Sequence, residues 1–238
     1  MDNILKIQIW SDIMCPFCYI GKRRIEGALA NFEHKDSVEI EWKSFQLDAS
    51  FEATAGDNIV DHLAIKYGKD KFWAQNMVDD MTEKAKNSGL DFHFEKAILA
   101  NSHNAHRLLH LAKNKHLGGV LKEQLLKAYL TDGKDVNDIE TLIYLGQAVG
   151  LDRTTVEEVL HSDAFSDAVK KDIAAAQKIG VQGVPFFVFD DKYAISGAQP
   201  EDVFLETLQK TWAEGSFVPI VKLVKTTNGD SCGVDGCE

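Results

Sequence analysis

The chain is poor in cysteine and in proline, with 4 of each among 238 residues. Four cysteines are too few for a disulfide scaffold in a chain of this length. No run of about 18 apolar residues occurs, so we expect no transmembrane helix and no membrane partner. Basic residues are also in deficit, since 26 Lys and Arg against 37 Asp and Glu give a net charge of -11. Nucleic acid is therefore not an expected partner, because its binders normally present a basic patch.

The remaining composition is that of a globular protein, with 45% hydrophobic and 26% charged residues. The first ten residues, MDNILKIQIW, lack the apolar h-region of a signal peptide. We therefore expect a cytoplasmic location, where structural disulfides do not persist. The cysteines nevertheless occur in pairs, Cys15 with Cys18 and Cys232 with Cys237. Such pairs are expected to be catalytic or metal-binding.

Hydrophobic periodicity predicts a strand, a helix and a strand, then a helical block, then two strands and a closing helix. The first strand, helix and strand lie at residues 4–10, 15–32 and 37–45. The helical block covers residues 57–178, the two later strands lie within residues 184–197, and the closing helix covers residues 199–213. Without the block, βαβ is followed by ββα, which is the order of a thioredoxin fold. We therefore predict an α/β protein in which a large all-helical insertion separates the two halves of a thioredoxin fold.

This order also predicts the domain organisation. The thioredoxin-like domain is discontinuous and comprises residues 1–50 and 179–214. Residues 51–178 form the helical insertion domain, and residues 215–238 form a partly extended C-terminal tail that carries the CxxxxC pair.

The sequence Cys15-Pro16-Phe17-Cys18 stands at the start of the first predicted helix. Unpaired N–H groups and the helix dipole stabilise an anion there, and proline suits the first helical position. We therefore expect Cys15 to be a thiolate of low pKa. Cys18 lies three residues later on the same helix face, within disulfide range, and is expected to be the buried resolving thiol. Cys15 would attack a substrate disulfide and Cys18 would resolve the mixed disulfide.

Two other interpretations of this pair are half of a zinc site and two incidental core cysteines. The succession of strand, CPFC and helix favours redox chemistry over both. Pro185 follows Val184 at the start of a predicted strand, where proline needs a special reason. We predict a cis peptide bond that leaves the backbone of Val184 free to pair with a bound peptide. The alternative is a trans proline in an edge strand.

Several separated segments resemble the DsbA-family oxidoreductases, and specifically the cytosolic FrnE-like branch, over nearly the whole chain. The matching segments are SDIMCPFCYIGKRRIE, SFQLD, NSHNAHRLLHLA, GVPFFVFDDKYAISGAQPEDVF and the terminal CGVDGC. The resemblance implies a thiol-disulfide oxidoreductase without cofactor or metal, in which Cys15 is the nucleophile, Cys18 the resolver and Pro185 the cis proline. Its expected substrates are protein or small-molecule thiols and disulfides, including glutathione. The residues expected to bind them are Pro16, Phe17, Val184 and His106.

The same superfamily includes kappa-class glutathione transferases and 2-hydroxychromene-2-carboxylate isomerases, which typically lack the CxxC pair. A glutathione-dependent enzyme of that kind is the alternative function. The intact CPFC sequence weighs against it, as does Ala198-Gln199, which stands where those enzymes usually have a Ser-Asp pair. A third hypothesis is a non-catalytic, zinc-stabilised or chaperone-like binding module.

Three histidines, His103, His106 and His110, share one face of a predicted helix and are candidate metal ligands. Hydrogen-bonded or solvated histidines are the favoured interpretation, because the sequence places no carboxylate or cysteine ligand beside them. Cys232 and Cys237 have three interpretations: a secondary redox pair that exchanges with Cys15 and Cys18, part of a four-thiolate zinc site, or an inert tail. The FrnE-like resemblance implies the first of these.

Overall fold

A five-stranded sheet forms the centre of the computed structural model, which describes residues 4–52, 58–215, 222–224 and 230–233. Its strand order is β2-β1-β4-β5-β6, with β1 parallel to β2, β4 antiparallel to both β1 and β5, and β6 parallel to β5. The strands are β1 (Leu5–Ser11), β2 (Val38–Ser44), β4 (Phe186–Phe189), β5 (Tyr193–Ser196) and β6 (Lys222–Leu223). A second, two-stranded sheet joins β3 (Gly183–Val184) to β7 (Cys232–Gly233).

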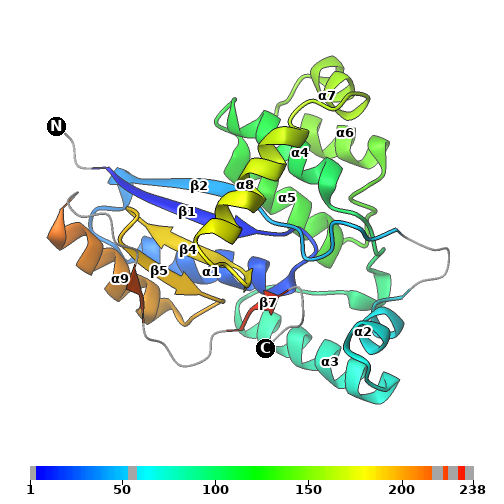
Figure 1. Ribbon diagram of the computed structural model, residues 1–238, viewed down its shortest axis with the longest axis horizontal. Coiled ribbons are helices and arrows are strands. Elements are labelled where there is room, and N and C mark those ends of the chain that lie inside the picture. Colours follow the sequence, from blue (N-terminus) through cyan, green and yellow to red (C-terminus); the bar gives the residue numbers. More distant parts are fainter. Residues whose placement is uncertain (1–3, 53–57, 216–221, 225–229, 234–238) are drawn as a thin grey trace.

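Helices cover both faces of the larger sheet. Helices α1 (Pro16–Ala30) and α9 (Glu201–Glu214) pack against each other on one face, and α8 (Ser166–Lys178) packs on β2 from the other (Figure 1). The predicted order of βαβ followed by ββα is confirmed, and so is the helical segment between the two halves. The protein is therefore an α/β protein with a thioredoxin fold.

The helices between β2 and α8 form two groups. Helices α2 and α3 pack on each other, whereas α4 packs against α5, α6 and α7 (Figure 1). Their bounds, with those of two 3-10 turns, are α2 (Ile59–Tyr67), α3 (Lys71–Asn87), α4 (His103–Lys113), α5 (Gly118–Leu130), α6 (Ile139–Ala148), α7 (Arg153–Leu160), η1 (Lys35–Ser37) and η2 (Phe94–Lys96). Because α8 packs on both α4 and β2, it connects the helical segment to the sheet. The domain boundaries at residues 51 and 178 stay predictions.

Local sequence explains where several elements begin and turn. Asp70, Asp138 and Asp152 cap α3, α6 and α7, because each carboxylate accepts a hydrogen bond from the backbone N–H three residues later. Asp190 and Asp191 have φ angles of 47° and 54°. This left-handed backbone gives a tight turn between β4 and β5, the two strands that the sequence predicts at residues 184–197.

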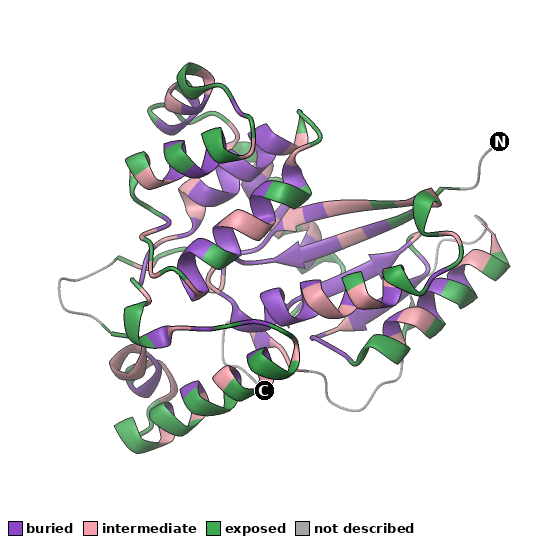
Figure 2. Cartoon of the chain, turned by 180° about the vertical axis from the view of Figure 1, so that it is seen from behind, coloured by how far each residue is buried: buried purple, intermediate pink, exposed green. Residues whose placement is uncertain are grey.

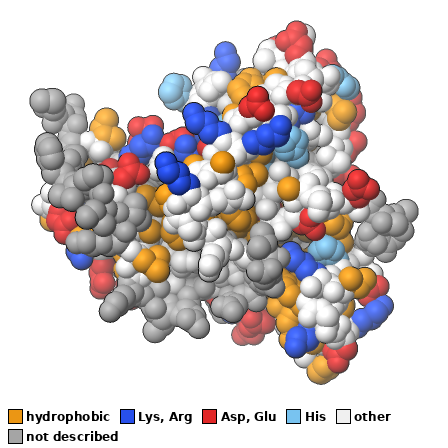
Figure 3. Space-filling view, viewed as in Figure 1, with side chains coloured by type: hydrophobic (Ala, Val, Ile, Leu, Met, Phe, Trp, Pro, Cys, Tyr) orange, Lys and Arg blue, Asp and Glu red, His pale blue; other side chains and the backbone are white. Residues whose placement is uncertain are grey.

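The apolar residues of the strands and helices form a continuous core, and Figure 2 colours much of the sheet and the helix segments beside it as buried. Strand β4 is buried along its whole length, and the rings of Phe187 and Phe204 pack edge to face with centroids 4.7 Å apart. On the face seen in Figure 3, acidic and basic side chains are interspersed. Within the described part of the chain, no helix is long and apolar enough to cross a membrane.

Candidate functional site

The CPFC sequence forms the start of α1, as predicted. Cys15 is the N-cap with extended backbone, Pro16 is the first helical residue, and the Cys18 N–H donates to the Cys15 carbonyl at 3.1 Å. Both cysteines are free thiols, and they are 0% and 1% exposed. The first turn of the helix therefore holds two buried thiols beside its unpaired N–H groups.

Cys15 lies against the loop that precedes β4. Its Sγ donates to the carbonyl of Val184 at 3.5 Å, and the Val184–Pro185 peptide bond is cis, as the sequence predicts. Helix α1 packs closely on this proline, since a Cβ at Gly21 would lie 2.9 Å from Pro185 Cγ. The fold thus joins two predicted motifs that are 169 residues apart in the sequence.

The pKa values of Cys15 and Cys18 depend on each other, because the two thiols are neighbours in the protein interior. Burial, followed by the neighbouring Cys18, raises the pKa of Cys15. Burial opposes ionisation of Cys18 as well, but the hydrogen bond from Cys15 and the positive charge of Lys122 lower the pKa of Cys18. Burial thus opposes the low pKa that the sequence predicts for Cys15.

A buried carboxylate lies directly before the dithiol. Asp12 is 1% exposed; its Oδ2 accepts from the Leu47 N–H at 2.8 Å, and its Oδ1 lies 3.2 Å from His106 Nε2. Burial favours the neutral acid, but the contact with His106 keeps the pKa of Asp12 below its usual range. Asp12 is therefore a buried anion, and its charge disfavours ionisation of Cys15.

The described end of the C-terminal tail pairs with β3, the strand whose Val184 contacts Cys15. Val184 pairs with Cys232 and Gly183 with Gly233 in the small antiparallel sheet. Gly183 permits this approach, because a Cβ there would lie 2.8 Å from the Cys232 carbonyl oxygen. Asp230 anchors the segment, accepting from Lys84 Nζ at 2.7 Å and, through its carbonyl, from the Ala198 N–H at 2.7 Å.

A largely apolar cavity opens beside these residues. It is bounded by the CPFC loop, by one side of α2, by Met81 of α3 and by the tail segment. Its lining includes Met14, Pro16, Phe51, Leu63, Tyr67 and Cys232. A substrate held near Cys15 would therefore meet apolar side chains.

Comparison with known proteins agrees with this geometry. The family model of the DSBA-like thioredoxin domain matches residues 6–209. The chain belongs to this family. Its DSBA-like thioredoxin fold also resembles the crystal structure of a probable DsbA oxidoreductase, SCO1869, from Streptomyces coelicolor. That likeness covers 98% of each chain with 37% identity and a TM-score of 0.83.

The chain is also similar to two further proteins. Uncharacterized protein YwbO of Bacillus subtilis (strain 168) is 28% identical over 201 residues, which are 83% of this chain and 92% of YwbO. The structure of cytosolic disulfide reductase DsbM from Pseudomonas aeruginosa with GSH has a TM-score of 0.59 at 17% identity. That likeness covers 86% of this chain and 99% of DsbM, and it shows a shared fold.

Within this DSBA-like chain, the three histidines of α4 have separate partners. His106 faces Asp12, His103 Nε2 lies 3.2 Å from Ser166 Oγ, and His110 Nε2 lies 3.2 Å from both Ser44 Oγ and Asp172 Oδ2. The favoured interpretation of hydrogen-bonded histidines is confirmed. In the described residues, no group of three His, Cys, Asp or Glu side chains is placed to hold a metal ion.

The residues predicted to bind substrate lie close to the dithiol, but all are buried. Pro16 lines the cavity, Phe17 packs below Lys84 with Nζ 5.5 Å from its ring centroid, and Val184 is covered by Cys232. His106 is 0% exposed and points to Asp12. This placement argues against direct substrate contact by His106, because the ring lies in the protein interior.

Sequence reasoning missed Lys122 on α5. It is 0% exposed, and its charge acts on Cys18 and Asp12. A signal was present, because Lys122 begins an i, i+3, i+4, i+7 series with Leu125, Leu126 and Tyr129. A lysine on the apolar face of a helix is a candidate buried charge.

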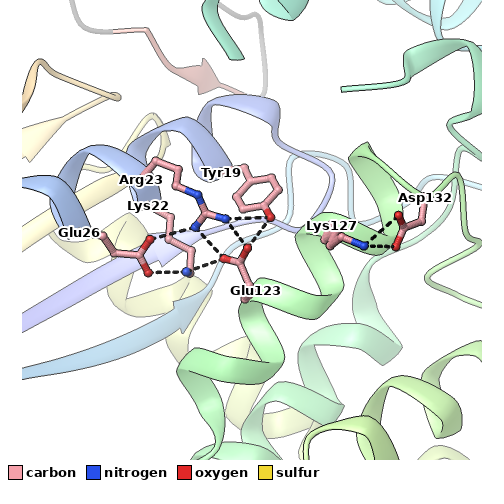
Figure 4. A network of polar contacts seen from close by, with 7 residues as sticks. All are labelled: Tyr19, Lys22, Arg23, Glu26, Glu123, Lys127 and Asp132. Carbon is pink, nitrogen blue, oxygen red and sulfur yellow. Dashed lines mark hydrogen bonds and ion pairs between the residues drawn. The ribbon is translucent and has the colours of Figure 1, made fainter. Parts of the chain in front are cut away.

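Helix α5 is also tied to α1 by a polar network (Figure 4). Glu123 accepts from Tyr19 Oη at 2.5 Å and from Lys22 Nζ at 2.6 Å, and it is paired with Arg23. Burial opposes the charge, but these contacts lower the pKa of Glu123 to about 2. The network fixes the insertion helix that carries Lys122 against the helix that carries the dithiol.

Proposed function

We propose that this protein is a thiol-disulfide oxidoreductase that exchanges disulfides with protein or small-molecule thiols through Cys15 and Cys18. The observation that carries the proposal is the position of two free thiols in the first turn of α1, with Cys15 Sγ against the carbonyl of Val184. This arrangement provides a nucleophile, a second thiol one turn later and an adjacent backbone edge. Its support from comparison is membership of the DSBA-like thioredoxin family.

The chemistry is two successive exchanges. The Cys15 thiolate attacks one sulfur of a substrate disulfide, forming a mixed disulfide and releasing the other sulfur as a thiolate. Cys18, after losing its proton, attacks Cys15 Sγ and releases the remaining substrate thiolate. The substrate disulfide is thereby reduced and Cys15–Cys18 is oxidised, and the reverse sequence oxidises a dithiol substrate. The first turn of α1 stabilises the thiolate that leaves or attacks.

A protein substrate would pair its backbone with β3. The support is the antiparallel pairing that Cys232 and Gly233 already make with Val184 and Gly183. An extended peptide uses the same hydrogen-bonding edge, with side chains entering the neighbouring cavity. Pro16 and Phe17 are proposed to flank this peptide. Substrate binding therefore requires the tail segment to leave β3.

We further propose that Cys232 belongs to a secondary redox pair with Cys237. Cys232 is disulfide-bonded and is the pairing partner of Val184, the residue whose carbonyl contacts Cys15. Its strand thus brings a disulfide sulfur to the edge that a substrate would use. Cys237 lies outside the described residues. Exchange between the two pairs would oxidise the dithiol of one pair and reduce the disulfide of the other.

Glutathione is the proposed small-molecule thiol, and the cytoplasm is the proposed location. Support comes from the fold shared with DsbM, which is described as a cytosolic disulfide reductase and whose structure was solved with GSH. Assignment to the FrnE-like branch stays a prediction. No organic cofactor is needed for this exchange, because both electrons are carried by the sulfurs.

Insulin reduction tests the proposed activity. We expect Cys15→Ser to abolish reduction in the presence of a dithiol reductant, and Cys18→Ser to accumulate mixed disulfides. Full activity of the Cys15 variant would overturn the proposal. Glutathione binding and isomerase turnover that survive loss of both cysteines would instead support the alternative glutathione-dependent enzyme.

Redox titration tests the secondary pair. The wild-type protein should show two coupled dithiol transitions, and a Cys232→Ser, Cys237→Ser variant should show one. A transition of Cys15 and Cys18 that is identical in both proteins would contradict exchange between the pairs.

A further inference from the structure

The hydroxyl of Tyr129 makes no hydrogen bond within the described part of the chain. Tyr129 lies on α5, is 1% exposed and lines the apolar cavity beside the CPFC loop. Among the described residues, the fully enclosed side-chain atoms without a partner are Ser11 Oγ, His106 Nδ1 and Lys122 Nζ. The Tyr129 oxygen is unpartnered without being enclosed, so it borders the cavity.

Two other tyrosine hydroxyls of the protein have carboxylate partners. Tyr19 Oη donates to Glu123 at 2.5 Å, and Tyr193 Oη donates to Glu214 at 2.7 Å. Buried polar groups usually have a partner, because an unsatisfied group costs free energy. A phenylalanine would serve packing alone, so the hydroxyl of Tyr129 points to a ligand in the cavity.

The cavity has the size and polarity of a pocket for one uncharged side chain. Its volume is about 80 Å³, which leaves room for roughly six water-sized groups, about one aromatic ring. Apolar side chains line it together with Asp12, Asp48 and Lys66. Because charges of both signs border the cavity, an anion or a cation would meet a like charge there, and either would also lose its hydration. A neutral ring with a polar tip avoids both costs.

The tail segment marks the place where a substrate would reach this cavity. Cys232 both pairs with Val184 and lines the cavity. A peptide that takes the place of Cys232 on β3 would therefore border the cavity as well. Pro16 also lines the cavity and directly follows Cys15, so the residue beside the reacting cysteine of the peptide would stand at the opening.

We propose that Tyr129 determines specificity, and that the cavity receives a tyrosine side chain adjacent to the cysteine of the substrate disulfide. This inference rests on the proposed dithiol exchange and names the class of disulfide that it serves. The Tyr129 hydroxyl and the substrate phenol form a hydrogen bond, and the substrate ring fills the apolar part of the cavity. A phenylalanine in the substrate would bury the Tyr129 hydroxyl without a partner, and an alanine would leave the cavity unfilled.

Three matched peptide disulfides test this specificity. Each is a pentapeptide in which tyrosine, phenylalanine or alanine flanks a central cysteine on both sides, with thionitrobenzoate disulfide-bonded to that cysteine. The Cys15 thiolate of the reduced full chain attacks the peptide sulfur, and the coloured thionitrobenzoate leaves as a thiolate. Each rate is divided by the rate of the same peptide with dithiothreitol. With the wild-type protein, we expect the tyrosine peptide to react about tenfold faster than the phenylalanine peptide and the alanine peptide to be slowest.

Substitution Tyr129→Phe removes only the hydroxyl. We expect the tyrosine peptide to react about tenfold more slowly with this variant, whereas the phenylalanine and alanine peptides react no more slowly than with the wild-type protein. Tyr144→Phe is the matched control, because Tyr144 lies on α6 and is 70% exposed. This control should change none of the three rates.

The outcomes distinguish this inference from the proposed function. If the wild-type protein releases thionitrobenzoate from none of the peptides, dithiol exchange itself fails. If it reacts with all three at equal normalised rates, or if Tyr129→Phe retains the preference for tyrosine, the specificity role is overturned while dithiol exchange stands. Equal slowing of all three peptides by Tyr129→Phe would assign the hydroxyl to structure and also overturns the role.

A second variant gives the same test if Tyr129→Phe fails to fold in a thermal melt. Leu63 lines the cavity from α2, so Leu63→Trp should narrow it. We expect this variant to slow the tyrosine and phenylalanine peptides and to leave the alanine peptide unchanged. An equal effect on all three peptides would overturn the cavity as the side-chain pocket.

Discussion

The Asp12 carboxylate joins the CPFC loop to the insertion helix α4, with Oδ1 3.2 Å from His106 Nε2 and both side chains almost completely buried. This contact places a negative charge behind the dithiol. Burial is the main cause that raises the pKa of Cys15, and the charge of Asp12 adds to it. An anion at this position therefore restrains ionisation of the nucleophile.

Substitution Asp12→Asn should make Cys15 easier to ionise. Removal of the charge is expected to lower the pH at which Cys15 ionises, because a like charge nearby disfavours an anion. Ultraviolet absorbance of the thiolate as a function of pH measures this transition. Asp36→Asn, in the exposed turn η1, is the control. A transition that stays in place or rises would show that Asp12 does not act on Cys15 through its charge.

Substitution Glu123→Gln should reduce stability in a pH-dependent way. The pKa of Glu123 is lowered to about 2 in the folded protein, whereas an unfolded glutamate has a pKa of about 4.3. The stabilisation is therefore present in full above about pH 4.3 and is lost as the pH falls towards 2. We expect a loss of about 1–3 kcal/mol at pH 7 and little difference from wild type near pH 2. Urea unfolding across this range measures the effect.

The control for this variant is Glu140→Gln. Glu140 lies on α6 in an exposed ion pair with Arg153, and such pairs contribute little. The polar network would not be the source of the stabilisation if both variants lost equal stability. The same conclusion would follow if the loss in Glu123→Gln did not change between pH 7 and pH 2.

Substitution Arg107→Met should loosen the connection between α7 and α8. The buried guanidinium donates to the carbonyls of Val159, Ser162 and Ala164, which would otherwise lack these partners. We expect a loss of about 3 kcal/mol, together with faster hydrogen exchange in residues 159–165. Arg153→Met is the exposed control and should change neither quantity appreciably. Unchanged exchange in this segment would show that the guanidinium does not hold it.

Substitution Asp230→Asn should expose the dithiol more often. The carboxylate contacts Lys84 at 2.7 Å and Arg24 at 3.9 Å, and these pairs help hold the strand that covers Val184. A weakening of about 1 kcal/mol corresponds to about fivefold faster alkylation of the dithiol by iodoacetamide. The difference should shrink at high salt, because the charges are partly exposed. Asp202→Asn on α9 is the control, and equal alkylation rates in the two variants would refute the anchor.

Local patterns were sufficient for much of the fold. The alternation at residues 37–45 predicts β2, and the helical periodicity at residues 15–32 predicts α1. These features depend on side-chain periodicity and on hydrogen bonds between residues a few positions apart. The short strands β6 and β7 carry no such signal, because their pairing is with distant edges.

The positions of the two thiols could also be predicted from adjacent residues. Cys15, Pro16 and Cys18 owe their arrangement to the start of one helix, so three adjacent positions define it. The pKa values of these thiols could not be predicted in this way. The expected low pKa of Cys15 follows from the helix terminus alone, whereas the structure adds burial and the charges of Asp12 and Lys122, two residues that lie outside α1.

The order of strands and helices, the paired thiols at a helix start and the proline before β4 can all be predicted from the amino-acid sequence, because each depends on neighbours along the chain. The charges around those thiols and the backbone edge that the tail occupies become known only from the folded chain. Electrostatic forces and strand pairing act through space, and Lys122, Asp230 and Cys232 reach the site from positions more than 100 residues away in the chain.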